Sequence, residues 1–193
     1  MLLRTQSYCG YFIGMTCSRG TVEIRPAVPG DATAIVRVRR EAIVAKAAAR
    51  YDQAILNNWA DAMDATDRVA KIERQISDSG FIVLVAEAGG ELTGFAMADL
   101  SNNELHALYV KPNRIGEVGR TLLAALENLA FEAVPFLVCD ASLNAEKFYK
   151  ANGYTEECRK DYVSRPSGVV SQVVQMRKHR PNADEGDELT KQG

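Results

Sequence analysis

Alternation of apolar and polar residues, or short apolar runs rich in β-branched residues, predicts strands in several parts of the chain. Three of them follow one another in the middle of the sequence and are joined by the turns Gly89-Gly90 and Asn102-Asn103. The strands expected from these patterns are 22–25, 81–87, 91–99, 104–110, 135–139, 154–163 and 169–176.

Apolar residues at a spacing of three or four predict helices between these strands. Asp31 is a candidate N-cap for the first helix, and Ser142 for the last. Gly153 offers the left-handed conformation that commonly ends a helix. The expected helices run from about 31 to 49, 52 to 63, 69 to 76, 116 to 132 and 142 to 152.

This order of elements predicts an α/β fold of the α+β type, with a mixed, mostly antiparallel sheet of six or seven strands flanked by helices. A length of 193 residues corresponds to one domain. We expect a flexible leader at 1–20, the domain at 21–178 and a disordered polar tail at 179–193. The leader makes a poor signal peptide, because Arg4 and Gly10 interrupt its apolar residues.

Composition narrows the classes of function. A net charge of −2 gives no general attraction to nucleic acid or to an anionic membrane. The chain has no apolar run near the ~20 residues that span a bilayer. Its four cysteines form no C-x-x-C pair and it has only two histidines, so no metal is expected. Scattered cysteines favour a reducing, cytoplasmic compartment.

The segment after the strand 104–110 carries the candidate chemistry. This strand runs into a short loop with two glycines and then into an amphipathic helix. Helix N-termini present unpaired N–H groups that bind phosphates, and Arg114 and Arg120 would add charge-assisted contacts. Taken alone, the segment is equally compatible with an ordinary tight turn.

Two motifs together resemble the GNAT superfamily of N-acetyltransferases. Arg114-x-x-Glu117-x-Gly119, after Val110-x-Pro112, is similar to its cofactor motif Q/R-x-x-G-x-G/A. Ser142-x-x-Ala145-x-x-x-Tyr149-x-x-x-Gly153-Tyr154 is similar to its second motif, N/S-x-x-A-x-x-x-Y-x-x-x-G-F/Y. The resemblance covers about 22–178, and Glu117 departs from it because the family has glycine there.

The resemblance implies a GNAT-like fold that uses acetyl-CoA as co-substrate. The backbones of Leu108 and Val110 would pair with the pantetheine arm, and loop amides from Ile115 to Arg120 would hold the pyrophosphate. Tyr149 would protonate the leaving thiolate, although packing in the core is the alternative for its side chain. The residues expected to bind the cofactor are Leu108, Val110, Arg114, Ile115, Gly116, Val118, Gly119, Arg120 and Ser142.

The acceptor amine needs a base, since most amines are protonated at neutral pH. Glu104 and His106 are two apart on one strand and hence are expected on one face with Leu108. Either is a candidate base, and the alternatives are a solvated carboxylate and a sheet histidine without a catalytic role. Tyr51 and Trp59, in the early helices, are candidates for lining the acceptor pocket or for helix packing.

The function expected is transfer of an acetyl group from acetyl-CoA to a primary amine by direct attack in a ternary complex. The partner would be a small-molecule or protein amine, with a homodimer as one option for assembly. Glu117 motivates the alternative, a non-catalytic acyl-CoA-binding or regulatory module. A dinucleotide-binding fold fits poorly, because three consecutive strands precede the glycine loop.

Overall fold

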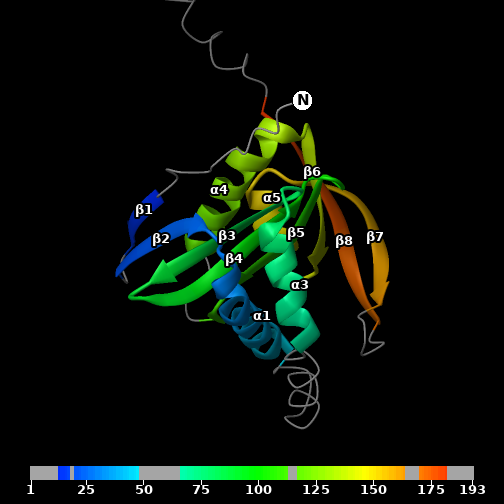
Figure 1. Ribbon diagram of the computed structural model, residues 1–193. Coiled ribbons are helices and arrows are strands. Elements are labelled where there is room, and N and C mark those ends of the chain that lie inside the picture. The colour runs from blue at the N-terminus through cyan, green and yellow to red at the C-terminus, as the bar shows by residue number, and fades with distance from the viewer. Residues whose placement is uncertain (1–12, 18–19, 48–65, 113–116, 164–169, 182–193) are drawn as a thin grey trace, which may run out of the picture.

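The computed structural model describes residues 13–17, 20–47, 66–112, 117–163 and 170–181. It contains a mixed sheet with helices on both faces (Figure 1). The helices are η1 (Pro29–Asp31), α1 (Ala32–Ala47), α3 (Thr66–Ser77), α4 (Glu117–Ala133) and α5 (Glu146–Ala151). The strands are β1 (Ile13–Cys17), β2 (Gly20–Pro26), β3 (Phe81–Ala88), β4 (Glu91–Asp99), β5 (Glu104–Val110), β6 (Phe136–Ser142), β7 (Thr155–Val163) and β8 (Val170–His179).

The sheet has eight strands in the order β1-β2-β3-β4-β5-β6-β8-β7. All neighbours are antiparallel except β5 and β6, which are parallel. The predicted mixed, mostly antiparallel sheet flanked by helices is confirmed. One strand more than expected occurs, because β1 pairs with β2 inside the stretch that was predicted to be a flexible leader.

Two apolar cores, one on each face, hold the helices to the sheet. α4 lies over one face through the predicted stripe that includes Val118, Leu122 and Leu126, and α5 packs on the same core. α1 and α3 cover the other face through Ile35, Val38 and partly buried α3 side chains. Because β3 and β4 are covered on both faces, residues 82–86 and 92–98 are all buried.

The edges of the sheet differ from its centre. The hairpin of β7 and β8 lies at the right of the view in Figure 1, and every residue of β7 is exposed.

The hairpin between β3 and β4 has the expected glycines, with φ of 60° at Gly89 and 77° at Gly90. Gly153, with φ of 85°, ends α5 as predicted.

Three local predictions differ from the structure or lie outside it. Ser142 is the last residue of β6 and does not cap a helix; its carbonyl accepts from the Ala145 N–H at 2.7 Å, and α5 begins at Glu146. The carboxylate of Asp31 accepts from the Val28 N–H at 2.8 Å and thereby closes the η1 turn that precedes α1. The expected helix 52–63 lies outside the described residues.

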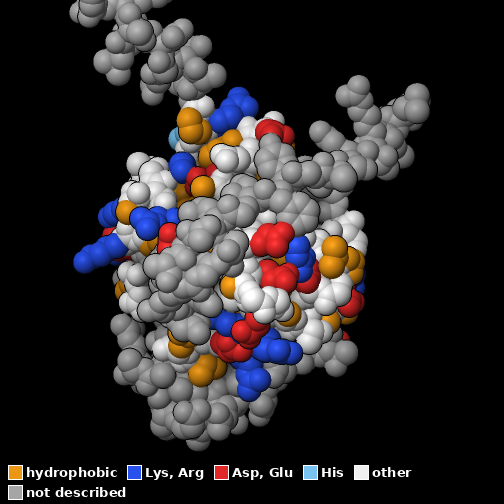
Figure 2. All heavy atoms as spheres, turned by 90° about the vertical axis from the view of Figure 1, so that its left-hand side faces the viewer, with side chains coloured by type: hydrophobic (Ala, Val, Ile, Leu, Met, Phe, Trp, Pro, Cys, Tyr) orange, Lys and Arg blue, Asp and Glu red, His pale blue; other side chains and the backbone are white. Residues whose placement is uncertain are grey.

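Several charged side chains on the surface form ion pairs. Arg25 holds β2 to its surroundings through two hydrogen bonds to Asp31, at 2.7 and 3.0 Å, and contacts to Glu87. On the face shown in Figure 2, acidic and basic side chains lie next to one another in several places. None of the helices within the described ranges is long and apolar enough to cross a membrane.

Candidate functional site

The sheet opens between its two parallel strands. β5 and β6 pair only at Glu104 and Val138, next to a hydrogen bond of 2.8 Å from the Val138 N–H to the Asn103 carbonyl. Beyond that pair, no further β5–β6 pairing occurs among the described residues of the two strands. A regular ladder would continue along both strands, so β5 and β6 must part toward their carboxyl ends.

The parting leaves backbone groups of β5 on the open side. The Lys111 N–H donates to the Thr93 carbonyl of β4 at 2.8 Å, and the Tyr109 carbonyl oxygen lies 3.1 Å from a Cβ built on Gly94 of β4. The backbone N–H and carbonyl groups of Tyr109 and Lys111 therefore face β4. Because these directions alternate along a strand, the backbone groups of Leu108 and Val110 face the side of β6. These groups are therefore placed to pair with an extended chain on that side.

A β-bulge changes the faces of β5. Leu105 pairs with Ala98 and Ala107 with Met97, so His106 is the extra residue of the bulge. Its ring meets the edge of Phe81, at 6.4 Å between centroids, on the α1 and α3 face. Leu108 packs against the α4 core instead. The prediction that His106 shares a face with Leu108 is therefore wrong, because strict alternation fails at a bulge.

Glu104 and His106 do lie together. The Nδ1 atom of His106 is 3.3 Å from Oε1 of Glu104. The side chains are 42% and 36% exposed, so both are open to solvent and to an incoming ligand. A carboxylate that bonds one ring nitrogen fixes the tautomer and leaves the other nitrogen available for proton exchange.

Tyr149 of α5 is buried in the α4 core. Its ring contacts the rings of Phe148 and Tyr154 edge-on, with 5.3 Å between centroids in each case. Burial raises the pKa of its phenol well above the usual value, and the neighbouring Cys139 and Tyr109 add to the shift. The hydroxyl therefore stays protonated at neutral pH.

The N-terminus of α4 meets the open end of β5. A Cβ on Gly119 would lie 3.7 Å from both Val110 Cγ2 and the ring of Phe148. β5, the N-terminus of α4 and α5 therefore meet at Gly119. Val118 and Gly119 are buried, whereas Glu117 and Arg120 are exposed. The predicted loop residues Arg114, Ile115 and Gly116 lie outside the described residues.

Gly94 contributes to this site, although the sequence pattern marked it only as a glycine within a strand. A Cβ on Gly94 would approach Leu122 Cδ1 to 3.0 Å and the Tyr109 carbonyl to 3.1 Å. The missing side chain lets α4 and β5 come close to β4. An isolated glycine inside a strand pattern is the signal that indicates such a close approach.

Other candidates lie apart from the opening or outside the described residues. Ser142 ends β6 and belongs to the far side of the opening, whereas Tyr51 and Trp59 fall outside the described ranges. Burial raises the pKa of the Cys139 thiol to about 12, which agrees with a buried apolar role. Among the residues described, no group of three or more His, Cys, Asp or Glu is arranged to hold a metal ion.

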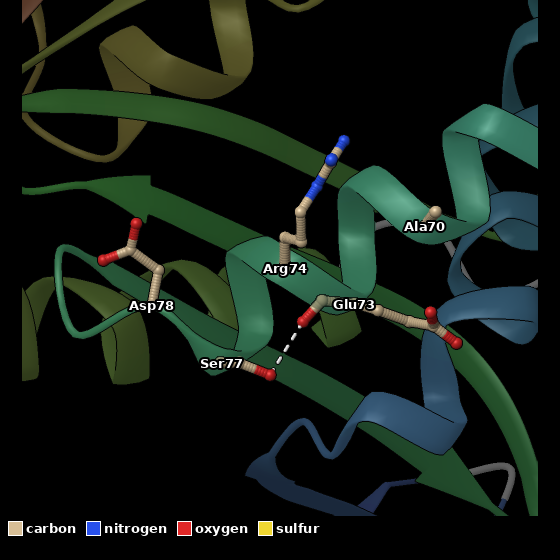
Figure 3. A pocket seen from close by; sticks show the side chains of 5 residues that line it. All are labelled: Ala70, Glu73, Arg74, Ser77 and Asp78. Carbon is tan, nitrogen blue, oxygen red and sulfur yellow. Dashed lines mark hydrogen bonds between the residues drawn. The ribbon is translucent and has the colours of Figure 1, made fainter.

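A shallow hollow on α3 is a separate feature (Figure 3). Its lining residues are Ala70, Glu73, Arg74, Ser77 and Asp78, all exposed, and the Ser77 hydroxyl donates to the Glu73 carbonyl at 2.9 Å. None of these residues belongs to β5, β6, α4 or α5. The hollow therefore has no part in the arrangement around the sheet opening.

Known structures share this architecture. A GCN5-related N-acetyltransferase from Rhodopseudomonas palustris, also described as Aminotransferase, Class-II, is 29% identical, with a TM-score of 0.69 over 89% of this chain and 100% of that one. The PaiA N-acetyltransferase from Thermoplasma acidophilum, in complex with coenzyme A, is 23% identical, with a TM-score of 0.65 over 82% and 99%. YncA of Salmonella typhimurium, with acetyl-CoA, is 23% identical, with a TM-score of 0.59 over 84% and 98%.

Sequence comparison assigns the family. No curated protein sequence gave a match. The family model described as Acetyltransferase (GNAT) domain matches residues 46–176, which is more than half of the chain. The match includes β5, the N-terminus of α4 and Tyr149, the elements that meet at the opening of the sheet. The chain therefore belongs to the GNAT acetyltransferase family.

Proposed function

We propose that the protein transfers an acetyl group from acetyl-CoA to a primary amine by direct attack in a ternary complex. The observation that carries the proposal is the parting of β5 from β6 after the single pair Glu104 and Val138. It leaves the backbone groups of Leu108 and Val110 facing the opening. These groups would bind the amides of the pantetheine arm as a neighbouring strand does.

The N-terminus of α4 would hold the phosphates of the co-substrate. Its first N–H groups have no partner within the helix and carry a partial positive charge. Gly119 keeps this turn close to Val110, and Arg120 is exposed beside it. The exposed side chain of Glu117 sits on the first turn, where a carboxylate favours the helix but would repel a pyrophosphate.

The two faces of the sheet would divide the proton transfers. Acetyl-CoA supplies an acetyl group activated as a thioester. On the α1 and α3 face, Glu104 and His106 would take a proton from the acceptor ammonium, directly or through water. On the α4 face, Tyr149 would give its proton to the sulfur as the carbon–sulfur bond breaks. Burial keeps the phenol protonated and also makes it a weaker acid, so the donation relies on the negative charge that develops on the sulfur.

A second candidate function is a non-catalytic acyl-CoA-binding module. Glu117, the first residue of α4, motivates it because the GNAT motif has glycine at this position. Under this alternative, acetyl-CoA binds but no amine is acetylated.

The test is release of the coenzyme A thiol from acetyl-CoA in the presence of a panel of primary amines. We expect turnover, and we expect Tyr149→Phe to lower kcat by about 100-fold, the lower range for a general acid. Affinity for acetyl-CoA should stay within a factor of about two. Tyr162→Phe is the matched control, because Tyr162 is 50% exposed on β7. Binding without turnover for any amine would favour the non-catalytic module, and an unchanged rate in Tyr149→Phe would remove Tyr149 from the mechanism.

A further inference from the structure

Two arginines from different helices converge on one tyrosine of β5. The guanidinium carbon of Arg39, on α1, is 5.7 Å from the centroid of the Tyr109 ring. The same ring stacks on Phe95, with 5.6 Å between centroids and 23° between planes. Arg68, on α3, is within electrostatic reach of both Arg39 and Tyr109. Packing of α1 against α3 brings these residues together.

Within the described part of the chain, neither arginine is paired with a carboxylate. The Nε atom of Arg68 is buried and has no acceptor there. Burial and the charge of Arg39 lower the pKa of Arg68. Two like charges and a buried donor without a partner both cost free energy in the folded chain.

The acidic residues described on α1 and α3 form no ion pair with Arg39 or Arg68. Glu41, on α1, is 3.8 Å from Nζ of Lys111, which also bonds Glu91. Asp67 and Glu73, on α3, are exposed. The other partly buried cations behave differently, since Arg25 and Lys178 each contact a carboxylate. No carboxylate in the described part of the fold therefore balances the positive charges of Arg39 and Arg68.

The arginine pair lies on the acceptor side of the proposed reaction. Tyr109 and Ala107 pack against the α1 and α3 core, and His106 meets Phe81 on the same face. Tyr109 follows His106 by three residues, which is about 10 Å along a strand. A small molecule with an amine at one end and an oxyanion at the other spans a length of this order.

We infer that Arg39 and Arg68 bind an oxyanion of the acceptor, so that the acceptor is a small amine that also carries a carboxylate or a phosphate. The inference rests on the proposed function, which places the reacting amine at Glu104 and His106. Guanidinium groups bind both oxyanions through paired hydrogen bonds. An acceptor with a second ammonium group would be repelled by the same two charges.

The first experiment compares acceptors of equal length. The full chain is assayed with acetyl-CoA and ω-amino acids from β-alanine to 8-aminooctanoate, and with the amino alcohols, diamines and aminoalkyl phosphates of the same lengths. At the best length we expect kcat/KM for one of the anionic acceptors to exceed that for the alcohol at least tenfold. The diamine should be the poorest. The ratio of carboxylate to phosphate identifies the oxyanion.

Variants connect the preference to the two side chains. Arg39→Gln and Arg68→Gln should each lower kcat/KM for the anionic acceptor about tenfold or more, mainly through KM, and change it less than twofold for the amino alcohol. Arg37→Gln is the control, because Arg37 is exposed on the same helix. Thermal unfolding of each variant shows whether it is folded.

The outcomes separate the two proposals. Equal kcat/KM for acid, alcohol and diamine would overturn the inference and leave the proposed function standing, as would equal losses for all acceptors in the arginine variants. No turnover with any amine would contradict the proposed function. In that case the Tm in the presence of the anionic compounds decides whether the anion site exists. A rise in Tm that is seen in the parent and lost in both Arg39→Gln and Arg68→Gln supports the site, and no rise in the parent overturns it.

Discussion

Replacing Gly94 with alanine tests the close contact that shapes the site. The added Cβ would lie 3.0 Å from Leu122 Cδ1, 3.1 Å from the Tyr109 carbonyl oxygen and 3.3 Å from Val110 Cγ2. The leucine methyl can turn away, but the carbonyl belongs to the β4–β5 ladder and can move only with the strand. Overpacking of this kind costs about 1–3 kcal/mol.

The net effect is smaller than the steric cost. Alanine restricts the unfolded chain more than glycine does, which returns about 0.4–1 kcal/mol. We therefore expect Gly94→Ala to lower the free energy of unfolding by about 1–2 kcal/mol, or the Tm by about 2–8 °C for a chain of this length. Affinity for acetyl-CoA should also fall, since β5 must shift at Val110.

Thermal and urea unfolding measure the effect, with Gly30→Ala as the control. The same Cβ on Gly30 meets nothing within 4 Å, so only the gain from restricting the unfolded chain remains and that variant should unfold about 1–4 °C above the parent. A Tm for Gly94→Ala equal to or above that of the parent would refute the reasoning, because it would mean that β4, β5 and α4 do not approach as closely as described.

Three further predictions follow from charged groups. Glu127→Gln removes the charge of the buried partner in the ion pair between Glu127 Oε2 and Lys178 Nζ, which are 2.6 Å apart. Because Lys178 is partly exposed, we expect a loss of about 2 kcal/mol in urea unfolding; a loss below about 0.5 kcal/mol would contradict this. Although burial alone would raise the pKa of Asp31, hydrogen bonds from Arg25 and a backbone N–H lower it in the folded chain. The stabilisation of the fold by the Asp31 carboxylate is therefore complete above the unfolded pKa near 4 and is lost as the pH falls through the lower folded pKa. The stability difference between the parent and Asp31→Asn should shrink over that acid range, and a pH-independent difference would count against the pair. Glu117→Gly should tighten acetyl-CoA binding in titration calorimetry, whereas weaker binding would show that the carboxylate supports the loop.

The order of elements was predictable because local pattern dominates it. Strand 104–110 was expected with the bounds that the structure has, since this mainly apolar run follows an Asn-Asn turn and stops shortly before a proline. The stripe of α4 followed from its spacing. Ile13–Cys17 was missed as a strand, because its pairing with β2 is a tertiary contact with no strong periodicity of its own.

The site was predictable only in part, because its geometry depends on register and packing. The motif resemblance predicts that Leu108 and Val110 bind the cofactor; their backbones face the opening, and their role in binding stays a prediction. The bulge at His106 arises from the β4–β5 register, which no local pattern fixes. Arg39 and Arg68 are far apart in sequence and meet only where α1 packs on α3, so no spacing rule connects them.

Acetyl-CoA binding is the most direct test of the central claim that the opening between β5 and β6 accepts this co-substrate. At a hundred times its Kd, the ligand should stabilise the chain by about 2.7 kcal/mol and raise the Tm by about 5–11 °C. ATP, which has an adenine nucleotide but no pantetheine arm, is the control and should raise it far less. A clear shift with acetyl-CoA alone is the result we predict. No shift at saturating acetyl-CoA, or an equal shift with ATP, would contradict the account.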